Sequence, residues 1–274
     1  MLVSKRVVGV VAFLGLSVGC AQAADLSGAP APSYKDAGNY WVVTIGGYAA
    51  IEPAFPGAKE SDHVWTGRPI FEFNRAGEKE WLSLPNDAFG LALYNTNNFR
   101  MGVAGDFINR RNQSDASTAL AGIHNIDYTF EGGAFAEYYP APFLRTRVEL
   151  LQGFTGANGL EANLMADFIY RPTPQLMLTA GPRMQIVDNK YASALFSTSA
   201  ADSVGVFNAS GGLHSAGIDV TARYALTDNV SLRAYGEWNR LLGDAADSNL
   251  VQQRGSADQV QVGVGAAYKF NFSW

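Results

Sequence analysis

The side chains best suited to catalysis or metal binding are few and scattered in this sequence. The histidines are His63, His124 and His214. The pairs Asp62 with His63 and His124 with Asp127 would each supply two ligands, but neither includes the third protein ligand that a zinc site needs. This favours a structural or solvated role for these histidines. No G-x-S-x-G motif accompanies His214 and no GxxxxGK[ST] phosphate loop occurs. We therefore predict a non-enzymatic protein with no catalytic, cofactor or metal site.

The charged residues, in contrast, follow a regular pattern. In the last eight of the alternating segments described below, charges keep to one parity, and the opposite parity is apolar, as at Phe107, Leu164 and Val220. In a membrane barrel this parity has a physical cause, because an Arg or Lys at the lipid-facing midplane costs about 2–4 kcal/mol. The predicted lumen charge network is Arg100, Asp106, Glu131, Glu137, Arg145, Arg147, Glu149, Glu161, Asp167, Arg183, Arg223, Arg233 and Glu237.

These charges need strands to position them, and alternation with a period of two recurs along the chain. The predicted strands are 40–51, 67–74, 79–85, 88–95, 99–108, 126–139, 143–152, 160–171, 175–187, 213–226, 230–241 and 258–272. We predict an all-β fold, a transmembrane antiparallel barrel of about twelve strands. A soluble exported β-sandwich is the alternative, although it does not account for the charge parity.

The connections alternate in length. Brief turns, such as 74–77, 95–98, 140–142, 171–174 and 226–229, separate long links at 52–66, 109–125, 153–159, 188–212 and 242–257. Short periplasmic turns and long outer loops are typical of bacterial barrels. Only the link from Leu84 to Ala88 is short on the long side, and residues 191–206 are compatible with a short loop helix.

The last segment alternates as well, with apolar residues at every second position. We expect Tyr268, Phe270, Phe272 and Trp274 to belong to a closing strand that pairs with the first strand and removes both sheet edges. An aromatic C-terminus of this kind resembles the signal read by the outer-membrane insertion machinery, which we predict as a partner together with outer-membrane lipid.

The first residues are predicted to be removed or flexible. Residues 1–23 combine an early positive charge, an apolar stretch and Ala21-Gln22-Ala23, which is typical of a signal peptide. Residues 24–39 are rich in Pro, Ala and Gly and are predicted to be a flexible periplasmic arm, followed by the barrel at 40–274. Cleavage would leave 18 basic and 25 acidic residues and no cysteine. Nothing in this balance favours a nucleic-acid partner.

Three stretches are similar to the MipA/OmpV family of Gram-negative outer-membrane proteins. They are IGGYAAIEPAFPGAKESDHVWTGRPIFEF (45–73), VDNKYASALF (187–196) and WNRLLGDAADSNLVQQRGSADQVQVGVGAAYKF (238–270). The most specific pieces are the EPAFPG turn and the GDAADSNLV loop. The chain departs from the usual pattern at Ser248-Asn249, where the family has Ser-Pro, and in the added residues 271–274.

The resemblance implies a role that composition and periodicity do not show. It implies a cell-envelope scaffold of the Gram-negative outer membrane that links a lytic transglycosylase to a penicillin-binding protein in murein assembly. Two alternatives stay open: a porin-like channel for small solutes and an adhesin acting through its outer loops. The mixed signs of the inward charges favour mutual neutralisation over the single-sign ring of a strongly selective pore.

Overall fold

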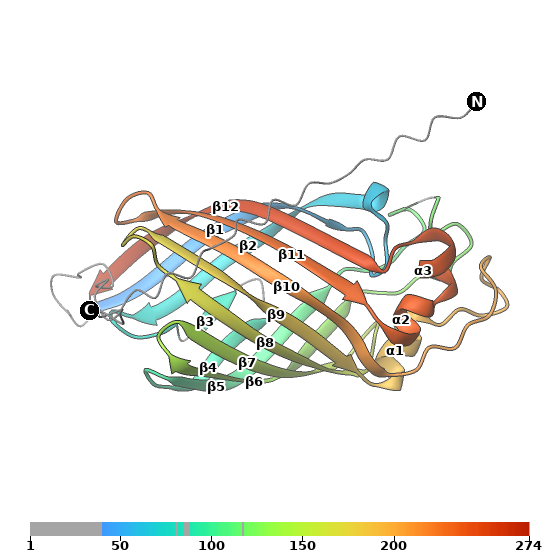
Figure 1. The fold of residues 1–274 in the computed structure, drawn as a ribbon, viewed down its shortest axis with the longest axis horizontal. Coiled ribbons are helices and arrows are strands. Elements are labelled where there is room, and N and C mark those ends of the chain that lie inside the picture. The colour runs from blue at the N-terminus through green and yellow to red at the C-terminus, as the bar shows by residue number, and fades with distance from the viewer. Residues whose placement is uncertain (1–39, 81, 85–87, 117, 274) are drawn as a thin grey trace, which may run out of the picture.

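The computed structural model describes residues 40–273 except 81, 85–87 and 117. Its twelve strands form a closed antiparallel barrel in which sequence neighbours pair and β1 also pairs with β12 (Figure 1). The predicted fold class is confirmed. The strands are β1 (Tyr40–Pro53), β2 (His63–Arg75), β3 (Leu82–Leu84), β4 (Phe89–Asn95), β5 (Phe99–Ile108), β6 (Thr129–Ala141), β7 (Leu144–Gly153), β8 (Leu160–Tyr170), β9 (Leu176–Val187), β10 (Gly212–Ala225), β11 (Val230–Leu241) and β12 (Asp258–Ser273).

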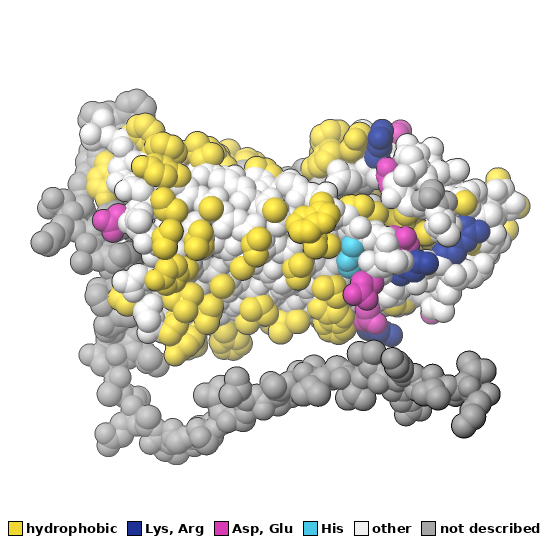
Figure 2. All heavy atoms as spheres, turned by 90° about the horizontal axis from the view of Figure 1, so that it is seen from above, with side chains coloured by type: hydrophobic (Ala, Val, Ile, Leu, Met, Phe, Trp, Pro, Cys, Tyr) yellow, Lys and Arg dark blue, Asp and Glu magenta, His cyan; other side chains and the backbone are white. Residues whose placement is uncertain are grey.

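Alternation along each strand divides the side chains between the lumen and the outer wall. On β8, Glu161 and Asp167 are buried, whereas Leu164 and Phe168 are exposed on the wall. Figure 2 shows hydrophobic side chains spread along the barrel wall, while most of the visible charged side chains gather at one end. The wall thus has the apolar surface that a bilayer requires, and the polar side chains lie inside or beyond it.

Some strand ends differ from the predicted ones. β2 begins at His63 and not at 67, because His63 to Thr66 continue the ladder opposite Pro53 to Ala50. β3 is only three residues long, since its ladder with β2 covers Phe71 to Phe73 alone. β6 begins at Thr129 and not at 126, and Ile126 forms an isolated bridge with Arg111.

The helices all lie at the end of the barrel that carries the long loops (Figure 1). They are the 3-10 turn η1 (Glu60–Asp62), α1 (Asn189–Phe196), α2 (Gly243–Asp247) and α3 (Asn249–Arg254). The Asp188 side chain caps α1 by accepting a hydrogen bond of 2.8 Å from the Tyr191 backbone N–H. The predicted loop helix at 191–206 is therefore shorter and begins earlier, and Thr198 bridges Phe207 beyond it. Among the described residues, no helix is long and apolar enough to cross a membrane.

The long loops pack into one cap with its own apolar interior. One cluster joins Tyr191, Leu195 and Phe196 of α1 to Leu241 and Val251. A second joins Phe55 to Leu120, Ile123, Val204 and Leu250, so it draws on four different loops. Because buried apolar contacts between separate loops hold them together, the cap is a folded part of the protein and not a set of independent loops.

Candidate functional site: the charged lumen

The middle and inner part of the lumen holds a continuous chain of ion pairs, which we call the inner network. Glu137 on β6 contacts three arginines: Arg100 at 3.2 Å, Arg145 at 3.0 Å and Arg147 at 3.4 Å, each between a guanidinium nitrogen and a carboxylate oxygen. The Arg147 Nε also lies 2.7 Å from Glu149 Oε1. These residues come from β5, β6 and β7, and their side chains lie inside the barrel.

The chain of ion pairs continues along the next strands. Arg145 contacts Asp167 at 3.2 Å, Asp167 contacts Arg183 at 2.7 Å, and Arg183 contacts Asp219 at 3.3 Å. Together these ion pairs link six consecutive strands, β5 to β10, through their side chains. Since the carboxylates of Glu137, Glu149, Asp167 and Asp219 are almost entirely buried, the arginines neutralise charges that would otherwise be costly to desolvate.

On the far side of the lumen, β11 contacts β2 directly. Arg233 donates to both carboxylate oxygens of Glu72, at 2.6 and 3.0 Å, in the forked geometry that strengthens such pairs. Arg223 lies 3.7 Å from the same carboxylate. Sequence reasoning missed Glu72, although it occupies the parity of Arg68 in its predicted strand and so carried the same signal.

The outer part of the lumen has a different charge. Asp106, Glu131, Glu161 and Glu237 of the predicted set face inward near the outer strand ends, and Glu52 joins them; we call these five residues the outer acidic ring. Arg68 also faces inward here and pairs with Glu52 at 3.0 Å. Arg183 of the inner network lines the same cavity as Asp106 and Glu237. Ion pairs thus run throughout the inner network, whereas acids outnumber bases in the outer acidic ring.

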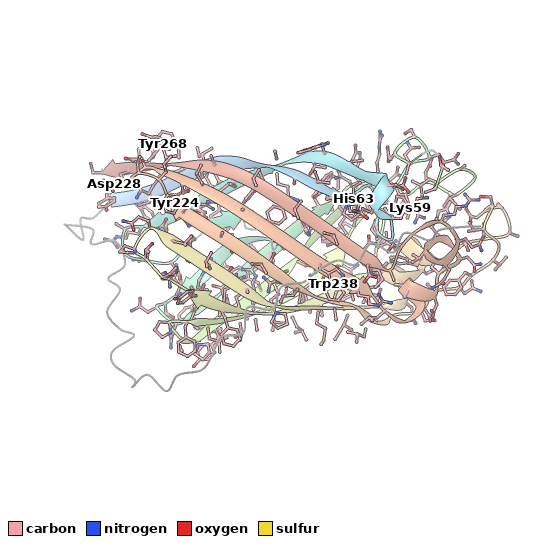
Figure 3. All side chains as sticks on the ribbon, turned by 45° about the horizontal axis from the view of Figure 1, so that its top comes forward. Lys59, His63, Tyr224, Asp228, Trp238 and Tyr268 are labelled. Atoms are coloured by element: carbon pink, nitrogen blue, oxygen red, sulfur yellow. The ribbon has the colours of Figure 1, made fainter. Side chains whose placement is uncertain are left out.

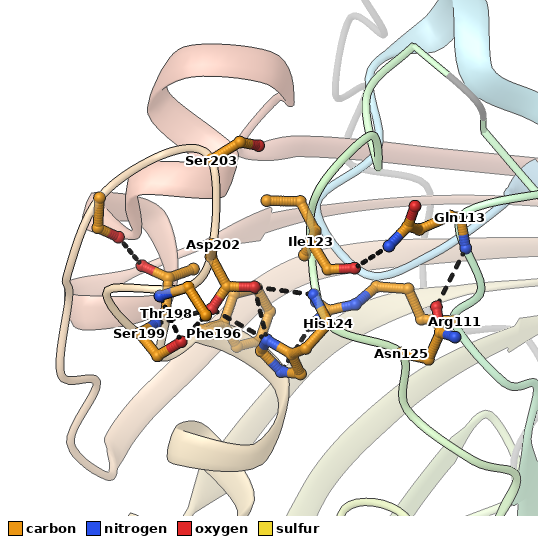
Figure 4. Close-up of polar contacts among 12 residues, drawn as sticks. Arg111, Gln113, Ile123, His124, Asn125, Phe196, Thr198, Ser199, Asp202 and Ser203 are labelled. Atoms are coloured by element: carbon orange, nitrogen blue, oxygen red, sulfur yellow. Dashed lines mark hydrogen bonds and ion pairs between the residues drawn. The ribbon is translucent and has the colours of Figure 1, made fainter.

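The cap is tied down by polar contacts between loops, which Figure 4 shows in close-up. The Asp202 carboxylate accepts hydrogen bonds from the backbone N–H of His124 at 2.7 Å and of Ser199 at 2.7 Å. The His124 ring lies 3.1 Å from the same carboxylate, and the Arg111 side chain donates to the Leu195 carbonyl at 2.7 Å. Burial alone would raise the pKa of Asp202, but these donors lower it to about 2.

The histidines occupy three separate environments. His124 belongs to the cap contacts just described, and His63 lies with Lys59 near the loop end of the barrel (Figure 3). Alternation in the predicted strand 213–226 would place His214 on the lipid-facing parity, but it is buried beneath α1, edge-on to Tyr191 with ring centroids 5.9 Å apart. The register shift between Leu213 and Ser215 explains the difference, because a bulge changes the parity of the residue it contains. No cluster of three metal-ligating side chains occurs among the described residues.

The closing strand carries aromatic side chains on the outer wall. Tyr268, Phe270 and Phe272 are exposed and lie opposite Ile45, Val43 and Trp41 of β1. Figure 3 places Tyr268 and Tyr224 near the turn end and Trp238 nearer the loop end of the barrel. Amphipathic aromatic rings at both ends of an apolar wall are typical of membrane interfaces. Trp274, the fourth residue of the predicted strand ending, lies outside the described residues.

A closed antiparallel barrel with an apolar wall, a charged interior and a loop cap defines the class of outer-membrane β-barrel proteins. The profile of one family, described as MltA-interacting protein MipA, matches residues 45–270. The chain belongs to the MipA family. No curated protein sequence matches it.

Among solved structures, the chain is similar to several outer-membrane barrels at low identity. An outer-membrane channel from Pseudomonas putida F1 matches with 9% identity over 85% of this chain and 96% of the other, at a TM-score of 0.42. The NanC porin matches with 8% identity over 84% and 100%, at 0.40. Neisserial surface protein A matches with 11% identity over 84% and 97%, at 0.27.

Proposed function

We propose that this protein is a non-conducting scaffold barrel of a Gram-negative outer membrane that holds enzymes of murein turnover at its periplasmic face. The observation that carries the proposal is the occupied lumen. The inner network places the large side chains of Arg147, Glu137 and Glu149 in the barrel interior with about 2% of their surface exposed or less. A side-chain network of this density favours a rigid, filled barrel over an open pore.

The cap supports the same conclusion from the other end. Tyr191 of α1 is almost fully buried and hydrogen-bonds to Glu161 of the outer acidic ring, so the cap reaches the lumen. Burial and the carboxylates of Glu161 and Glu131 raise the pKa of the Tyr191 hydroxyl well above its usual value, which keeps it a proton donor to these acids. The cap therefore covers the outer end of the lumen, and the inner network fills its inner part.

The partner half of the proposal rests on the family. The name MltA-interacting protein is the basis for proposing a lytic transglycosylase as a partner, with a penicillin-binding protein as the second enzyme. The periplasmic surface would be formed by the short turns, such as those at 140–142, 171–174 and 226–229, and by residues 24–39. We also propose that the aromatic ending at 268–274 is read by the insertion machinery.

The conductance of single barrels tests the first half. Purified protein in planar lipid bilayers should give no reproducible current steps at ±100 mV. A double variant, Arg145→Ser with Arg147→Ser, should give steps, because it removes two guanidinium groups from the filled lumen. Reproducible steps from the unchanged protein would favour the solute channel instead.

Recovery of partners tests the second half. Tagged protein should recover a lytic transglycosylase and a penicillin-binding protein from crosslinked envelopes, and deletion of 24–39 should reduce the recovery. A control is Lys190→Ala, an exposed position of the cap at the opposite end of the barrel, which leaves the periplasmic turns unchanged. Equal recovery with and without 24–39 would remove that segment from the proposal.

A further inference from the structure

Among the described residues, no strand lies between the outer halves of β2 and β5. β3 pairs with β2 only at Phe71 to Phe73, and β4 begins at Phe89 opposite Gly105 of β5. Among the described residues, no strand pairs with His63 to Ile70 on the side of β2 that faces away from β1. The described strands therefore leave a gap between the outer parts of β2 and β5.

Both borders of this gap have features of finished strand edges. Pro69 lies on β2 just above the last β3 contact, and proline has no N–H to offer to a further strand. On β5, the backbone N–H of Phe107 donates to the side chain of Asp106 at 2.7 Å, where a strand partner would otherwise accept. The edges are therefore adapted to remain unpaired, which argues against a partner strand completing the sheet.

A cavity of about 910 Å³ passes through the gap. Its lining includes Gly67 and Phe107 of the wall as well as Glu131 and Glu237 of the outer acidic ring, so it joins the membrane side to the lumen. Residues 53–56, within the EPAFPG turn, also line it. The volume lies within the range of ordinary small-molecule sites, roughly 300–1,000 Å³.

The two ends of the cavity differ in polarity. On the outside, Phe107 of the lining is 47% exposed, and Trp65, between the lining residues Val64 and Thr66 in sequence, is 74% exposed. On the inside, Glu131 is only 6% exposed, and its carboxyl group interacts with the carboxyl group of Glu161. The charged side chains that line the cavity are four acids, Glu52, Asp106, Glu131 and Glu237, and one base, Arg68, which pairs with Glu52. Because acids outnumber bases in this lining, the interior favours a cation over an anion.

We propose that this gap is a lateral binding site for an amphiphile with a cationic head group and one apolar chain. The head group enters the outer acidic ring at Glu131, and the chain stays in the bilayer beside Trp65 and Phe107. An anionic amphiphile is disfavoured by the same carboxylates. A small hydrophilic cation gains nothing from the apolar border. The site goes beyond the scaffold function and does not depend on it.

The test uses the protein in zwitterionic lipid nanodiscs, with empty nanodiscs subtracted. Labelled dodecyltrimethylammonium should bind with one saturable site per barrel. Dodecyl sulfate should show no saturable binding, and tetramethylammonium should compete at least 100-fold more weakly than the unlabelled C12 cation. A diazirine on the C12 chain should label β2 at 63–70 or β5 at 105–108, as mapped by mass spectrometry.

Three variants sharpen the test. Glu131→Gln should weaken binding at least tenfold while keeping the cavity shape. Gly67→Trp should block the gap, because a Cβ there has no neighbour within 4 Å and the indole can occupy the opening. Gly236→Trp is the matched control on the wall of β11, where a Cβ would meet only Val262 at 3.9 Å, and it should bind as the unchanged protein does. Heat-dependent gel mobility verifies that each variant is folded.

Three results would overturn the proposal. They are equal saturable binding of dodecyl sulfate, equal competition by tetramethylammonium, and full binding by folded Gly67→Trp. Labelling confined to the cap or to β9 and β10 would likewise place the amphiphile elsewhere. None of these results bears on the conductance or the enzyme partners of the barrel, so failure here and failure of the scaffold proposal are distinguishable.

Discussion

The Nε of Arg147 and the Oε1 of Glu149 lie 2.7 Å apart, and each side chain is about 1% exposed. The two residues are two positions apart on β7, so both point into the lumen. The guanidinium also lies 4.3 Å from the centroid of the Phe135 ring and donates to the Ala88 carbonyl at 3.3 Å. A single arginine therefore joins β7 to β6 and to the start of β4.

Replacing Arg147 should lower the stability of the barrel. Arg147→Met leaves the buried carboxylates of Glu149 and Glu137 with fewer partners, and the free energy of unfolding should fall by about 3–5 kcal/mol. Urea unfolding in lipid vesicles, followed by tryptophan fluorescence, measures it. Arg240→Ala is the control, because Arg240 and Asp258 form an exposed pair, and such pairs contribute at most about 1 kcal/mol. Equal losses in the two variants would contradict the buried network.

A charge on the outer wall should act against membrane insertion. Leu164 lies in the middle of β8, between Val148 and Met184 of its neighbours, and faces outward. Leu164→Arg should destabilise the inserted barrel by about 2–4 kcal/mol. Asn163→Arg, one residue earlier, faces the lumen and should be tolerated better. Folding yields into vesicles compare the two, and equal yields would mean that this face does not meet lipid.

The cap should loosen at acidic pH. The pKa of Asp202 is about 2 in the folded cap, below its usual 3.8, so its ionised form stabilises the cap by about 2 kcal/mol. A lowered pKa means that this stabilisation is complete above about pH 4 and is lost as the pH falls towards 2. Hydrogen exchange of residues 188–211 should therefore accelerate over that range.

The variant Asp202→Asn separates this effect from general acid unfolding. It should show faster exchange at neutral pH and a smaller change on acidification. Asp228→Asn, in a turn at the opposite end of the barrel (Figure 3), should behave as the unchanged protein does. Unaltered exchange in Asp202→Asn would show that other contacts hold the cap.

Lys79, in the turn after β2, should react with acylating reagents at lower pH than an ordinary lysine. Its Nζ lies 2.9 Å from the centroid of the Tyr139 ring, and burial lowers its pKa from 10.5 to about 8. The rate of acetylation, measured by mass spectrometry, should be half-maximal near pH 8. Tyr139→Ala opens the environment and should move the midpoint upward, whereas an unchanged midpoint would exclude burial against this ring as the cause.

Much of the barrel can be predicted from the sequence because the relevant signal is local. Alternation at Leu164 or Phe168 repeats within a few residues, and lipid on one face enforces it, so β5 and β11 have the predicted ends. The pairing of charges depends on contacts between strands, which the pattern within one strand does not show. Glu137 contacts Arg145 and Arg147, whereas Glu131, on the same strand and in the same predicted set, belongs to the outer acidic ring.

The cap and the lateral gap escaped prediction for a related reason. Phe55 and Leu250 are in one apolar cluster although nearly 200 residues separate them, and periodicity along the sequence does not predict such a contact. α2 and α3 are too short to show a helical period. The brevity of the link after Leu84 was visible, but its effect depends on how far β2 and β5 extend beyond it.

The pairing of Tyr40 with Ser273 has a consequence for biogenesis. These partners are 233 positions apart, so the seam joins the earliest and latest parts of the sheet to be synthesised. Every other ladder is a hairpin between strands adjacent in sequence and can zip locally, whereas this one has a high contact order and a large loop-closure entropy. The barrel therefore cannot close before β12 has been synthesised. A chain stalled before β12 would expose two unpaired sheet edges to chaperones and proteases.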